Sequence, residues 1–396
     1  VLVLLAALLA AVWWWPTDPG HALMVAVSVL IVTCPCALSL ATPVAMLSAA
    51  GTLARSGVLV RNLQGLEALA EIDTVVFDKT GTLTRDGMVV RGVHTQGALS
   101  SADALALAAL LARQSLHPVS RALVSAAQAA QTDAAQSRWQ VSDIQEVSGY
   151  GLTAQVCDAQ GVLPACQVLL GSPRHAQQPA IEIDMADPTA PSQQVVLAWQ
   201  LGTAAPLELA RFDLTEDLRS EAAAAVQVLR ESGVAVQLLS GDRAQAAARI
   251  AAQAGIAKWR GDCTPQDKLT ALQALQANGQ RVAMVGDGLN DGPVLAGAHV
   301  SFAFGRAVPL AQSRSDFVVL GSNLSLIAQS VVLARRTLRI VRQNLWWAAG
   351  YNALSVPLAI AGYMPAWLAG LGMALSSWLV VLNAARLSRP LPALGL

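Results

Sequence analysis

The stretch TVVFDKTGTLT, residues 74–84, joins an apolar run to a loop of acidic and hydroxyl residues. Residues Thr74–Phe77 are typical of a buried strand, and Asp78 follows them directly. A carboxylate at the carboxyl end of a parallel strand lies at the mouth of the sheet, where such folds bind ligands. It can attack a phosphoryl group and form an aspartyl-phosphate. Backbone N–H groups and a hydroxyl for the phosphate oxygens come from Thr80, Gly81 and Thr82.

Two further acidic loops follow predicted strands. Ser240-Gly241-Asp242 follows the run Val234–Leu239, and GDGLND, residues 286–291, follows Arg281–Val285. Alternation of such strands with alanine-rich helices predicts a parallel sheet covered by helices, and two of these helices are expected at Ser220–Glu231 and Ala244–Ala254.

The three loops together predict a phosphoryl-transfer site. One Asp-Gly pair alone would usually be a turn, whereas three acidic loops, each after its own strand, rarely arise by chance. Carboxylates of residues 286–291 beside Asp78 would make an oxygen-rich site for Mg²⁺. Lys268 would offset the charge that develops in phosphoryl transfer.

The composition places part of the chain in lipid. Hydrophobic residues make up 54% of the 396 residues and charged residues 13%, about half of the ~25% charged fraction of soluble proteins. The formal net charge of +0 gives no electrostatic argument for a nucleic-acid partner. Three of the five cysteines, Cys157, Cys166 and Cys263, are scattered and indicate no disulfide framework.

Four apolar segments lie at the two ends of the chain, and the last three are long enough for a spanning helix of roughly 20 residues. They cover Val1–Trp15, His21–Pro43, Leu345–Tyr363 and Ala366–Ala385. The two hairpin tips carry no Lys or Arg, whereas arginines cluster at the other ends of the segments. Because positive residues stay on the cytoplasmic side, the tips are expected to face outward and the middle region to be cytoplasmic. The arginines are Arg55, Arg61, Arg335, Arg336, Arg339, Arg342, Arg386 and Arg389.

A Cys-Pro-Cys sequence interrupts the second apolar segment. Proline at position 35 removes a helical hydrogen bond and opens the turn, which lipid tolerates where the region lines a cavity. The thiols of Cys34 and Cys36 at this break make a soft site suited to Cu(I), Ag(I) or Zn²⁺. The competing interpretation is two buried cysteines that act as small hydrophobic residues.

The motifs together resemble one family. Asp-Lys-Thr-Gly-Thr at 78–82 and GDGLND at 286–291 resemble the signature of P-type ATPases, on a haloacid-dehalogenase-like domain, and the Cys-Pro-Cys ahead of them is similar to the heavy-metal (type IB) branch. This resemblance covers essentially the whole chain. It implies that Asp78 is phosphorylated and that Asp78, the Thr80 carbonyl and Asp287 hold Mg²⁺. The catalytic set that it implies is Asp78, Lys79, Thr80, Thr82, Ser240, Gly241, Asp242, Lys268, Asp287, Asn290 and Asp291.

The resemblance also implies a domain plan. We expect a multi-domain membrane protein with α-helical transmembrane hairpins and an α/β haloacid-dehalogenase-like phosphorylation domain that carries an inserted α+β nucleotide-binding domain. The expected parts are the hairpin 1–70, the phosphorylation domain 71–87 and 206–322, the nucleotide-binding domain 88–205 and the hairpin 323–396. The implied nucleotide-binding residues are His117, Pro118, Gly149 and Gly151. Leu116 stands where the family often has Glu, and Glu146 has no assigned role.

The third and fourth apolar segments favour a monovalent ion. Neither contains Asp, Glu or Lys, and a divalent ion stripped of water needs charge compensation in lipid. The pattern resembles the copper-transporting branch, which implies Tyr351, Asn352, Met373 and Ser377 as further metal ligands. The flanks WWWP at 13–16 and TCPCALSLATP at 33–43 are similar to copper pumps that serve bacterial haem–copper oxidase assembly.

The expected function is ATP-driven export of Cu(I) or Ag(I), with ATP and Mg²⁺ as cofactors, across a bacterial inner membrane. The lipid bilayer is an expected partner, a copper chaperone or an oxidase-assembly factor is a candidate partner, and nucleic acid is not expected. The alternatives are a zinc or cadmium pump, a membrane-anchored haloacid-dehalogenase-type phosphatase and a non-enzymatic copper-binding module. Such a phosphatase would have a second Asp where Thr80 stands.

The upstream part of such a pump is not in this sequence. The chain begins at Val1 inside an apolar run and contains no Thr-Gly-Glu, the loop with which the family's actuator domain hydrolyses the aspartyl-phosphate. We therefore expect a C-terminal fragment without the actuator domain and the N-terminal metal-binding region. Its aspartyl-phosphate is expected to turn over slowly.

Overall fold

The computed structural model describes residues 2–97, 99–131, 138–147, 150–159, 165–180, 191–286, 292–304, 315–321 and 323–390. The chain divides into two compact units. One unit contains Val1–Phe77, Ala224–Val236 and Pro265–Leu396, and the other contains Asp78–Ala223 and Gln237–Thr264.

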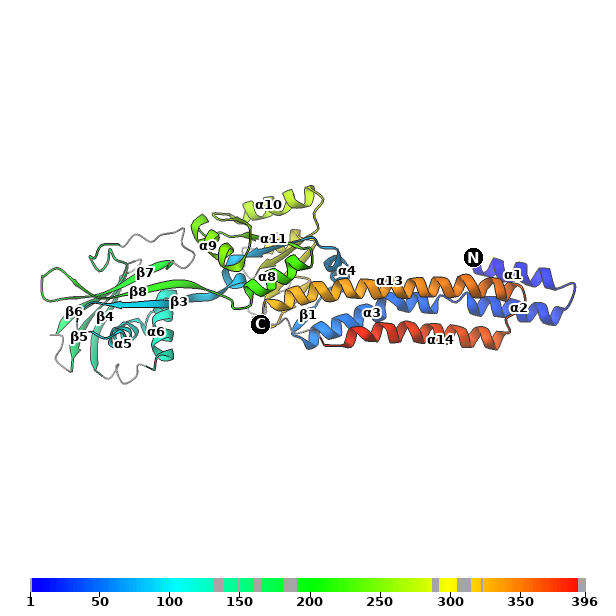
Figure 1. Cartoon of the computed structure of the whole chain (residues 1–396), viewed down its shortest axis with the longest axis horizontal. Helices are drawn as coiled ribbons and strands as arrows, with labels where there is room; N and C mark the ends of the chain where they lie inside the picture. Colours follow the sequence, from blue (N-terminus) through cyan, green and yellow to red (C-terminus); the bar gives the residue numbers. More distant parts are fainter. Residues whose placement is uncertain are drawn as a thin grey trace. The chain divides into compact units, whose positions relative to one another are not determined.

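Five helices at the two ends of the chain form the apolar part of the first unit (Figure 1). They are α1 (Leu2–Trp14), α2 (Pro19–Val32), α3 (Cys36–Arg55), α13 (Ser325–Ile360) and α14 (Ala366–Ala385), and the short helix η3 (Arg386–Ser388) follows the last. Asp18 caps α2 by accepting hydrogen bonds from the backbone N–H groups of Gly20 and His21. The break between α2 and α3 falls at the Cys-Pro-Cys sequence, as predicted, because a proline cannot continue the helical ladder.

Two apolar segments extend further than the sequence indicated. Helix α3 continues past Pro43 to Arg55. Helix α13 begins at Ser325, well before its first arginine, Arg335. Among the described residues, two stretches are long and apolar enough to cross a membrane, Pro19–Arg55 and Ala366–Ser388. The apolar half of α13 is not one of them, because its tryptophan, tyrosine and asparagine side chains lower its hydropathy.

Small residues pack these helices together, and large apolar residues face outward. Ala22, Ala41 and Ala369 are fully buried, so the backbones approach closely, as at helix contacts in membranes. Leu9 and Leu47 are 68% and 62% exposed. A surface of this kind is stable against lipid tails rather than water.

A seven-stranded sheet has the order β1-β13-β12-β11-β2-β9-β10. Its strands are β1 (Val58–Val60), β2 (Thr74–Asp78), β9 (Ala235–Leu239), β10 (Lys258–Arg260), β11 (Val282–Gly286), β12 (Val300–Phe304) and β13 (Phe317–Val319). Strands β2, β11 and β12 are parallel and buried throughout, because helices cover parallel sheets on both faces. The accompanying helices are α4 (Gln64–Glu71), α8 (Ala222–Glu231), α9 (Ala244–Ala254), α10 (Pro265–Ala277) and α11 (Gly292–Gly297).

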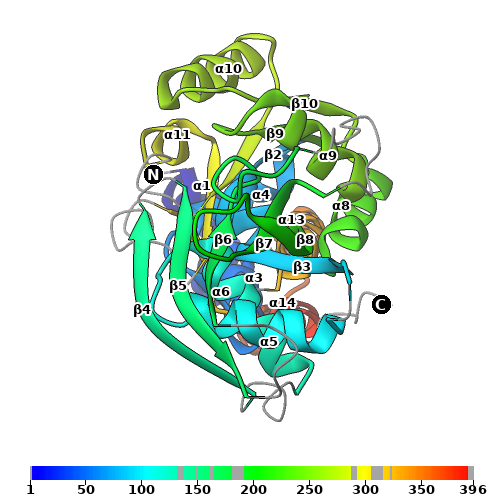
Figure 2. The same ribbon diagram turned by 90° about the vertical axis from the view of Figure 1, so that its left-hand side faces the viewer.

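The region inserted between β2 and β9 forms a separate antiparallel sheet of six strands in the order β3-β8-β7-β6-β5-β4 (Figure 2). Its elements are β3 (Thr84–Thr95), α5 (Ser101–Ala112), α6 (Pro118–Ala129), β4 (Trp139–Val147), β5 (Gly151–Asp158), β6 (Cys166–Gly171), β7 (Gln193–Gln200) and β8 (Leu207–Leu218). The predicted domain boundary between residues 87 and 88 falls inside β3, which pairs with β8 from Thr84 onward.

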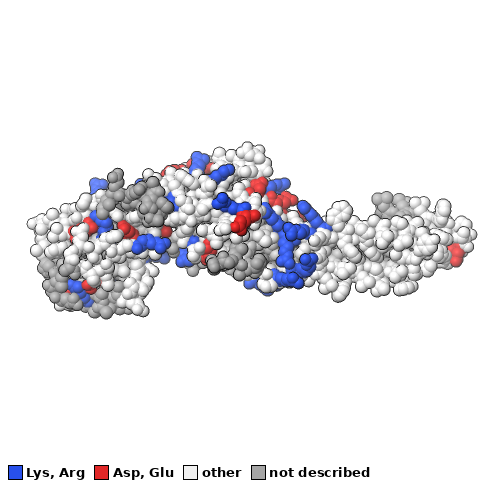
Figure 3. Space-filling view, in the orientation of Figure 1, with Lys and Arg blue, Asp and Glu red and all other residues white. Residues whose placement is uncertain are grey.

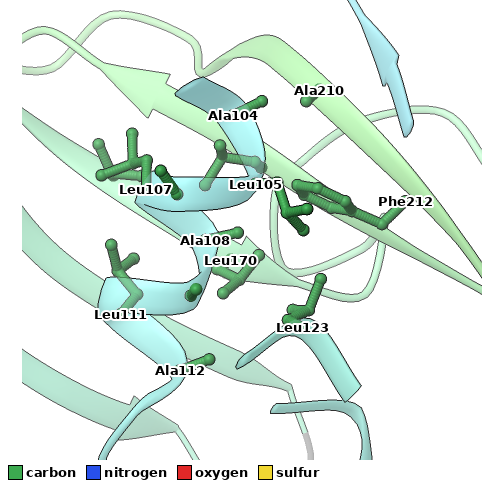
Figure 4. Packing of buried hydrophobic residues seen from close by; sticks show 14 of the residues in the cluster. Ala104, Leu105, Leu107, Ala108, Leu111, Ala112, Leu123, Leu170, Ala210 and Phe212 are labelled. Atoms are coloured by element: carbon green, nitrogen blue, oxygen red, sulfur yellow. The ribbon is translucent and has the colours of Figure 1, made fainter. Parts of the chain in front are cut away.

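The core of this insert lies between α5, α6 and one face of the sheet. Leu107 and Leu111 of α5 pack with Leu123 of α6, Leu170 of β6 and Phe212 of β8 (Figure 4). Ser100 caps α5 by accepting a hydrogen bond from the Asp103 N–H at 3.1 Å. The insert is therefore an α+β layer with its own core, as the sequence predicted.

Candidate functional site

The first feature of the site is the loop after β2. Asp78 is the last residue of that strand and only 6% exposed. Strand β11 lies beside β2 in parallel, with Phe77 opposite Val285, so both strands end at the same edge of the sheet. The loop turns at Gly81, whose φ of 69° is a conformation that other residues adopt at a cost. The fold thus presents the Asp78 carboxyl where a parallel sheet binds ligands.

Two predicted loops meet through Lys79. Its buried ammonium forms ion pairs with Glu216 and, at 2.6 Å, with Asp242 Oδ2. The Thr80 hydroxyl donates to the same Asp242 oxygen at 3.3 Å, and the Asp242 N–H donates to Ser240 Oγ at 3.0 Å. Gly241 lies between them and is exposed. The loop after β9 therefore reaches the loop after β2, as the parallel sheet predicted.

Lys79 sets the charge state of Asp242. Burial raises the pKa of this carboxyl, but the hydrogen bond and the charge of Lys79 lower it more, and the hydroxyls of Thr80 and Ser240 add to that effect. The net result is a pKa below the ordinary value for aspartate. Asp242 is therefore a carboxylate at neutral pH, so that Lys79 stays held between two negative charges.

Two residues of this site were missed from the sequence. Arg219 is buried, and its guanidinium donates to the Thr82 and Gly81 carbonyls, each at 2.6 Å. Glu216 is the second partner of Lys79. Both lie in the segment 213–219 that follows the insert, and a buried arginine cannot be recognised there before its partners are known. Thr82, which the sequence did select, is buried with its hydroxyl unpaired.

The donors at this edge fit Mg²⁺. The Asp78 carboxyl and the Thr80 carbonyl are hard oxygen ligands of the kind that Mg²⁺ prefers. Strand β11 ends at Gly286 beside the end of β2. The predicted Asp287, Asn290 and Asp291 come next in the sequence and lie outside the described residues. Lys268 is buried in the first turn of α10, and its approach to the phosphoryl group stays a prediction.

A cavity of about 500 Å³ opens next to the loop. Basic side chains of Lys79, Arg85, Arg243 and Arg249 line it, together with Glu216 and Asp242. Four cations against two carboxylates favour an anionic ligand. Pro118, one of the predicted nucleotide-binding residues, also lines this cavity.

A smaller cavity of about 140 Å³ lies in the insert and brings together other predicted residues. His117 and Gly151 line it, and Glu146, which had no predicted role, lies there with Ser115. His117 caps α6 by accepting the Val119 N–H at Nδ1, 3.3 Å away, so the ring carries its proton on Nε2. That N–H remains available to a ligand. Gly149 lies outside the described residues.

Gly151 is required by close contact between strands. A Cβ at this position would lie 2.4 Å from the Leu170 carbonyl oxygen, and a Cβ on its partner Gly171 would lie 2.4 Å from the Tyr150 carbonyl oxygen. The two glycines face each other in the β5–β6 register. Gly171 was missed from the sequence, because a single glycine at a strand end carries no distinctive signal.

A third cavity, of about 10 Å³, lies at the break between α2 and α3. Cys34, Tyr351, Asn352 and Met373 line it, so the fold brings four predicted metal ligands to one place. The sulfurs of Cys34 and Cys36 are joined as a disulfide, which places both side chains on the same side of Pro35. Their reduction would leave two thiols there.

Ser377 is not among the described residues that line this cavity, and its role as a metal ligand stays a prediction. Ser376 lines the cavity instead and is buried, with the Trp347 Nε1–H donating to its hydroxyl at 3.2 Å. Neighbouring residues on an α-helix point about 100° apart, so only one of two adjacent serines can face the cavity. Tyr351 packs against Gly372, where a Cβ would lie 2.8 Å from the phenol oxygen, and this hydroxyl is buried without a hydrogen-bond partner.

Comparison with known proteins places this arrangement in a family. The family model described as haloacid dehalogenase-like hydrolase matches residues 72–299. The chain therefore belongs to the haloacid dehalogenase-like hydrolase family. An Asp at the carboxyl end of the buried parallel strand β2 agrees with that assignment.

Longer relatives define the branch within it. The chain is 36% identical to the nitrogen fixation protein FixI of Rhizobium meliloti (strain 1021), over 98% of this chain and 48% of that protein. It is 33% identical to the copper-exporting P-type ATPase of Bacillus subtilis (strain 168), over 98% and 47%. The crystal structure of a zinc-transporting PIB-type ATPase in the E2.Pi state matches with a TM-score of 0.81 and 29% identity, over 98% of this chain and 62% of that chain.

These matches confirm the predicted resemblance to heavy-metal P-type ATPases and the predicted fold class. The chain spans about half the length of the curated relatives that it matches.

Proposed function

We propose that the chain is the phosphorylation and ion-binding half of an ATP-driven pump that exports Cu(I) or Ag(I). The observation that carries the choice of ion is the cavity at the Cys-Pro-Cys break. Once the Cys34–Cys36 disulfide is reduced, its lining offers a thiol, a phenol, an amide, a thioether and a hydroxyl, and none of the described lining residues is Asp, Glu, His, Lys or Arg.

This lining favours a soft monovalent ion through the type of its ligands rather than through its charge. Two thiolates with one Cu(I) carry a single negative charge, whereas with a divalent ion they are neutral, so net charge does not select Cu(I). Zinc, however, prefers four strong ligands, and here the further donors are weak, neutral oxygens and a thioether. A thioether binds Cu(I) well and is a poor ligand for zinc. The zinc-transporting structural relative keeps zinc as the competing candidate.

The two cavities of the second unit suggest how ATP would bind. The smaller one, with His117 and Glu146, suits the adenine and ribose, because imidazole stacks on a base and a carboxylate accepts from hydroxyls. The larger one, with its four cations, suits the triphosphate. ATP would then reach toward Asp78 with its phosphate end, as an in-line attack requires.

The loop residues would prepare that attack. Asp78 attacks the γ-phosphorus as a carboxylate, its new O–P bond forms as the bond to ADP breaks, and ADP leaves with the electron pair. Lys79 is held near the reacting group by Glu216 and Asp242, and Arg219 keeps the Gly81 and Thr82 backbone in place. Mg²⁺, when bound, would neutralise phosphate charge.

Coupling between phosphorylation at Asp78 and ion binding at the Cys-Pro-Cys break would pass through the segment of chain that joins these two sites. Helix α3 starts at Cys36, and β1, α4 and β2 follow it within the same unit before Asp78. A change at the aspartyl-phosphate would thus be passed through these elements to the Cys-Pro-Cys break, so that the ion binds from the cytoplasm and leaves outward. Within this proposal the domain limits, the inner-membrane location and a copper-delivering or oxidase-assembly partner follow from the resemblance.

The test is phosphorylation of the full chain with γ-labelled ATP and Mg²⁺ under reducing conditions, with Cu(I), Ag(I) or Zn²⁺ added or chelated. We expect an alkali-labile label that rises with Cu(I) or Ag(I) and not with Zn²⁺. Cys34→Ser is expected to keep a basal label and lose the response to Cu(I), because it removes one of the two thiolates. Cys157→Ser changes an exposed cysteine of β5 in the other unit; it is the matched control and should respond like the parent.

Three outcomes would count against parts of the proposal. A label that responds only to Zn²⁺ would favour the zinc pump. An unchanged Cu(I) response in Cys34→Ser would remove the Cys-Pro-Cys break from the ion pathway. Absence of any label in a folded sample would contradict the phosphorylation chemistry itself.

A further inference from the structure

The membrane helices carry a group of arginines that the pump mechanism does not use. They lie at the end of α3, in the interior of α13 and in or just after η3, all within the first unit. Figure 3 shows basic side chains gathered where the uncharged helices begin. We name this group the basic belt and define it as Arg55, Arg336, Arg339, Arg342, Arg386 and Arg389.

Hydrogen bonds join members of the basic belt across elements. Arg336 donates to the Arg386 carbonyl oxygen at 3.0 Å, which ties α13 to η3. Arg55 of α3 donates to Thr52 Oγ1 at 2.9 Å and to the Ser388 carbonyl oxygen. The arginine-bearing stretches of α3, α13 and η3 are therefore joined into one hydrogen-bonded collar.

The belt has no negative partner in the described part of the chain. None of the ion pairs that the structure describes includes one of its members. The side chains of Arg339, Arg342 and Arg389 are exposed and make no hydrogen bond to a described residue. Like charges on one surface repel each other unless an anion lies between them.

The depth of the belt matches lipid headgroups. Arg342 and Arg339 precede Leu345, where the apolar half of α13 begins, by three and six residues, or about 4.5 and 9 Å along the helix. The headgroup layer on each side of the hydrocarbon core is about 5–7 Å thick, so Arg342 falls within it and Arg339 lies just beyond it, from where its long side chain can extend back. Trp346, four residues after Arg342, is 80% exposed, as expected for an aromatic side chain at the membrane interface.

We propose that the basic belt binds the phosphate groups of anionic phospholipids at the cytoplasmic surface of the membrane. Each guanidinium can donate two hydrogen bonds to one phosphate, and the hydrogen-bonded collar positions several of them for neighbouring headgroups. Binding of this kind goes beyond the proposed pump function and does not depend on ATP, on Asp78 or on the transported ion.

The experiment uses the full chain in neutral detergent and titrates it with dioleoylphosphatidylglycerol or dioleoylphosphatidylcholine, with lipid retention measured by native mass spectrometry. The parent is expected to bind phosphatidylglycerol tightly and phosphatidylcholine weakly. Because one arginine near an anionic surface changes the affinity about fivefold, Arg339→Gln/Arg342→Gln should raise the Kd for phosphatidylglycerol about thirtyfold. Arg339→Lys/Arg342→Lys keeps the charge but loses the paired hydrogen bonds of each guanidinium, so its Kd should lie between those of the parent and the glutamine variant.

The matched control is Arg281→Gln, an exposed arginine that lies 3.9 Å from Glu71 and outside the helices. It should bind both lipids like the parent. Should the glutamine variant fold poorly, the parent alone still tests the proposal, since its Kd for phosphatidylglycerol must rise as salt is raised from about 0.05 to 0.5 M. Equal binding of both lipids by the parent, or unchanged binding by the glutamine variant, would overturn the proposal.

Discussion

The loop after β2 and the break between α2 and α3 each place a functional residue at an interruption of regular structure, but the surroundings of the two residues differ in charge. Both interrupt regular structure at a functional residue, Asp78 in one and Cys34 in the other. Around Asp78 the side chains are fully charged, and Lys79 is paired with two carboxylates. Around Cys34 the described lining is uncharged, and Thr33 satisfies its hydroxyl locally by donating to the Val29 carbonyl at 2.6 Å.

The difference follows from the solvent of each region. A loop in contact with water can hold ions, because water and opposite charges stabilise them and a phosphoryl group requires them. A cavity among membrane helices cannot hold unpaired ions cheaply, so a soft metal ion is better bound there by polarisable neutral groups and thiolates. The two regions should therefore respond to different perturbations.

The largest effect is expected from Asp78→Asn. An amide cannot act as the nucleophile, so the phosphorylated fraction should fall by at least about a thousandfold. Cu(I) binding, measured by competition with a chromogenic chelator, should stay within about twofold of the parent, since the amide leaves the membrane cavity unchanged. A parallel loss of Cu(I) binding would show that the two regions do not act separately.

Arg219→Met should have the next largest effect. The substitution removes the two hydrogen bonds that the guanidinium donates, so the Gly81 and Thr82 carbonyls lose this donor. The loss should lower the free energy of unfolding by about 3 kcal/mol. Denaturant unfolding of the full chain measures the loss. The exposed Arg91→Gln is the control and should change stability by less than about 0.5 kcal/mol. A loss of similar size in both variants would contradict the assigned role.

Tyr351→Phe tests the role of the phenol oxygen in the membrane cavity, because it removes only the hydroxyl. The phenol oxygen is buried without a hydrogen-bond partner, so its removal should leave stability unchanged or slightly higher. If the oxygen contacts the ion, the Kd for Cu(I) should rise about tenfold, as for other groups around metal sites. Ser377→Ala, adjacent to Ser376 but off the cavity lining, should leave the Kd unchanged. An equal effect of both substitutions would mean that the cavity has been assigned to the wrong residues.

The smallest effect concerns the pH dependence of Asp242. Its pKa in the folded chain lies below the ordinary value, so its contribution to stability is present above the unfolded pKa of about 4 and is lost as pH falls through the folded pKa. Since nearly half of the side chain is exposed, the contribution is expected to stay below about 1 kcal/mol. Stability measured between pH 6 and pH 3 should therefore fall slightly less in Asp242→Asn than in the parent. A steeper acid loss in the variant would contradict this sign.

Local patterns in the sequence were enough to predict most elements. Helices α9 and α14 have the predicted bounds, Ala244–Ala254 and Ala366–Ala385, because their ends are set by nearby glycine, proline and polar residues. Asp78 was identified as the end of a strand, and Cys34 as part of a helix break, for the same reason. In each case the decisive information lies within a few residues of the position.

Contacts between residues far apart in the chain could be identified only from the tertiary structure. Glu216 pairs with Lys79 across 137 positions, and Gly171 matters only because β6 lies against Gly151. Ser376 rather than Ser377 faces the cavity because the packing of α14 sets its rotation, which no local pattern specifies. The sequence thus determined which chemical groups the chain carries and where its helices break, whereas packing between distant elements decided which of those groups meet.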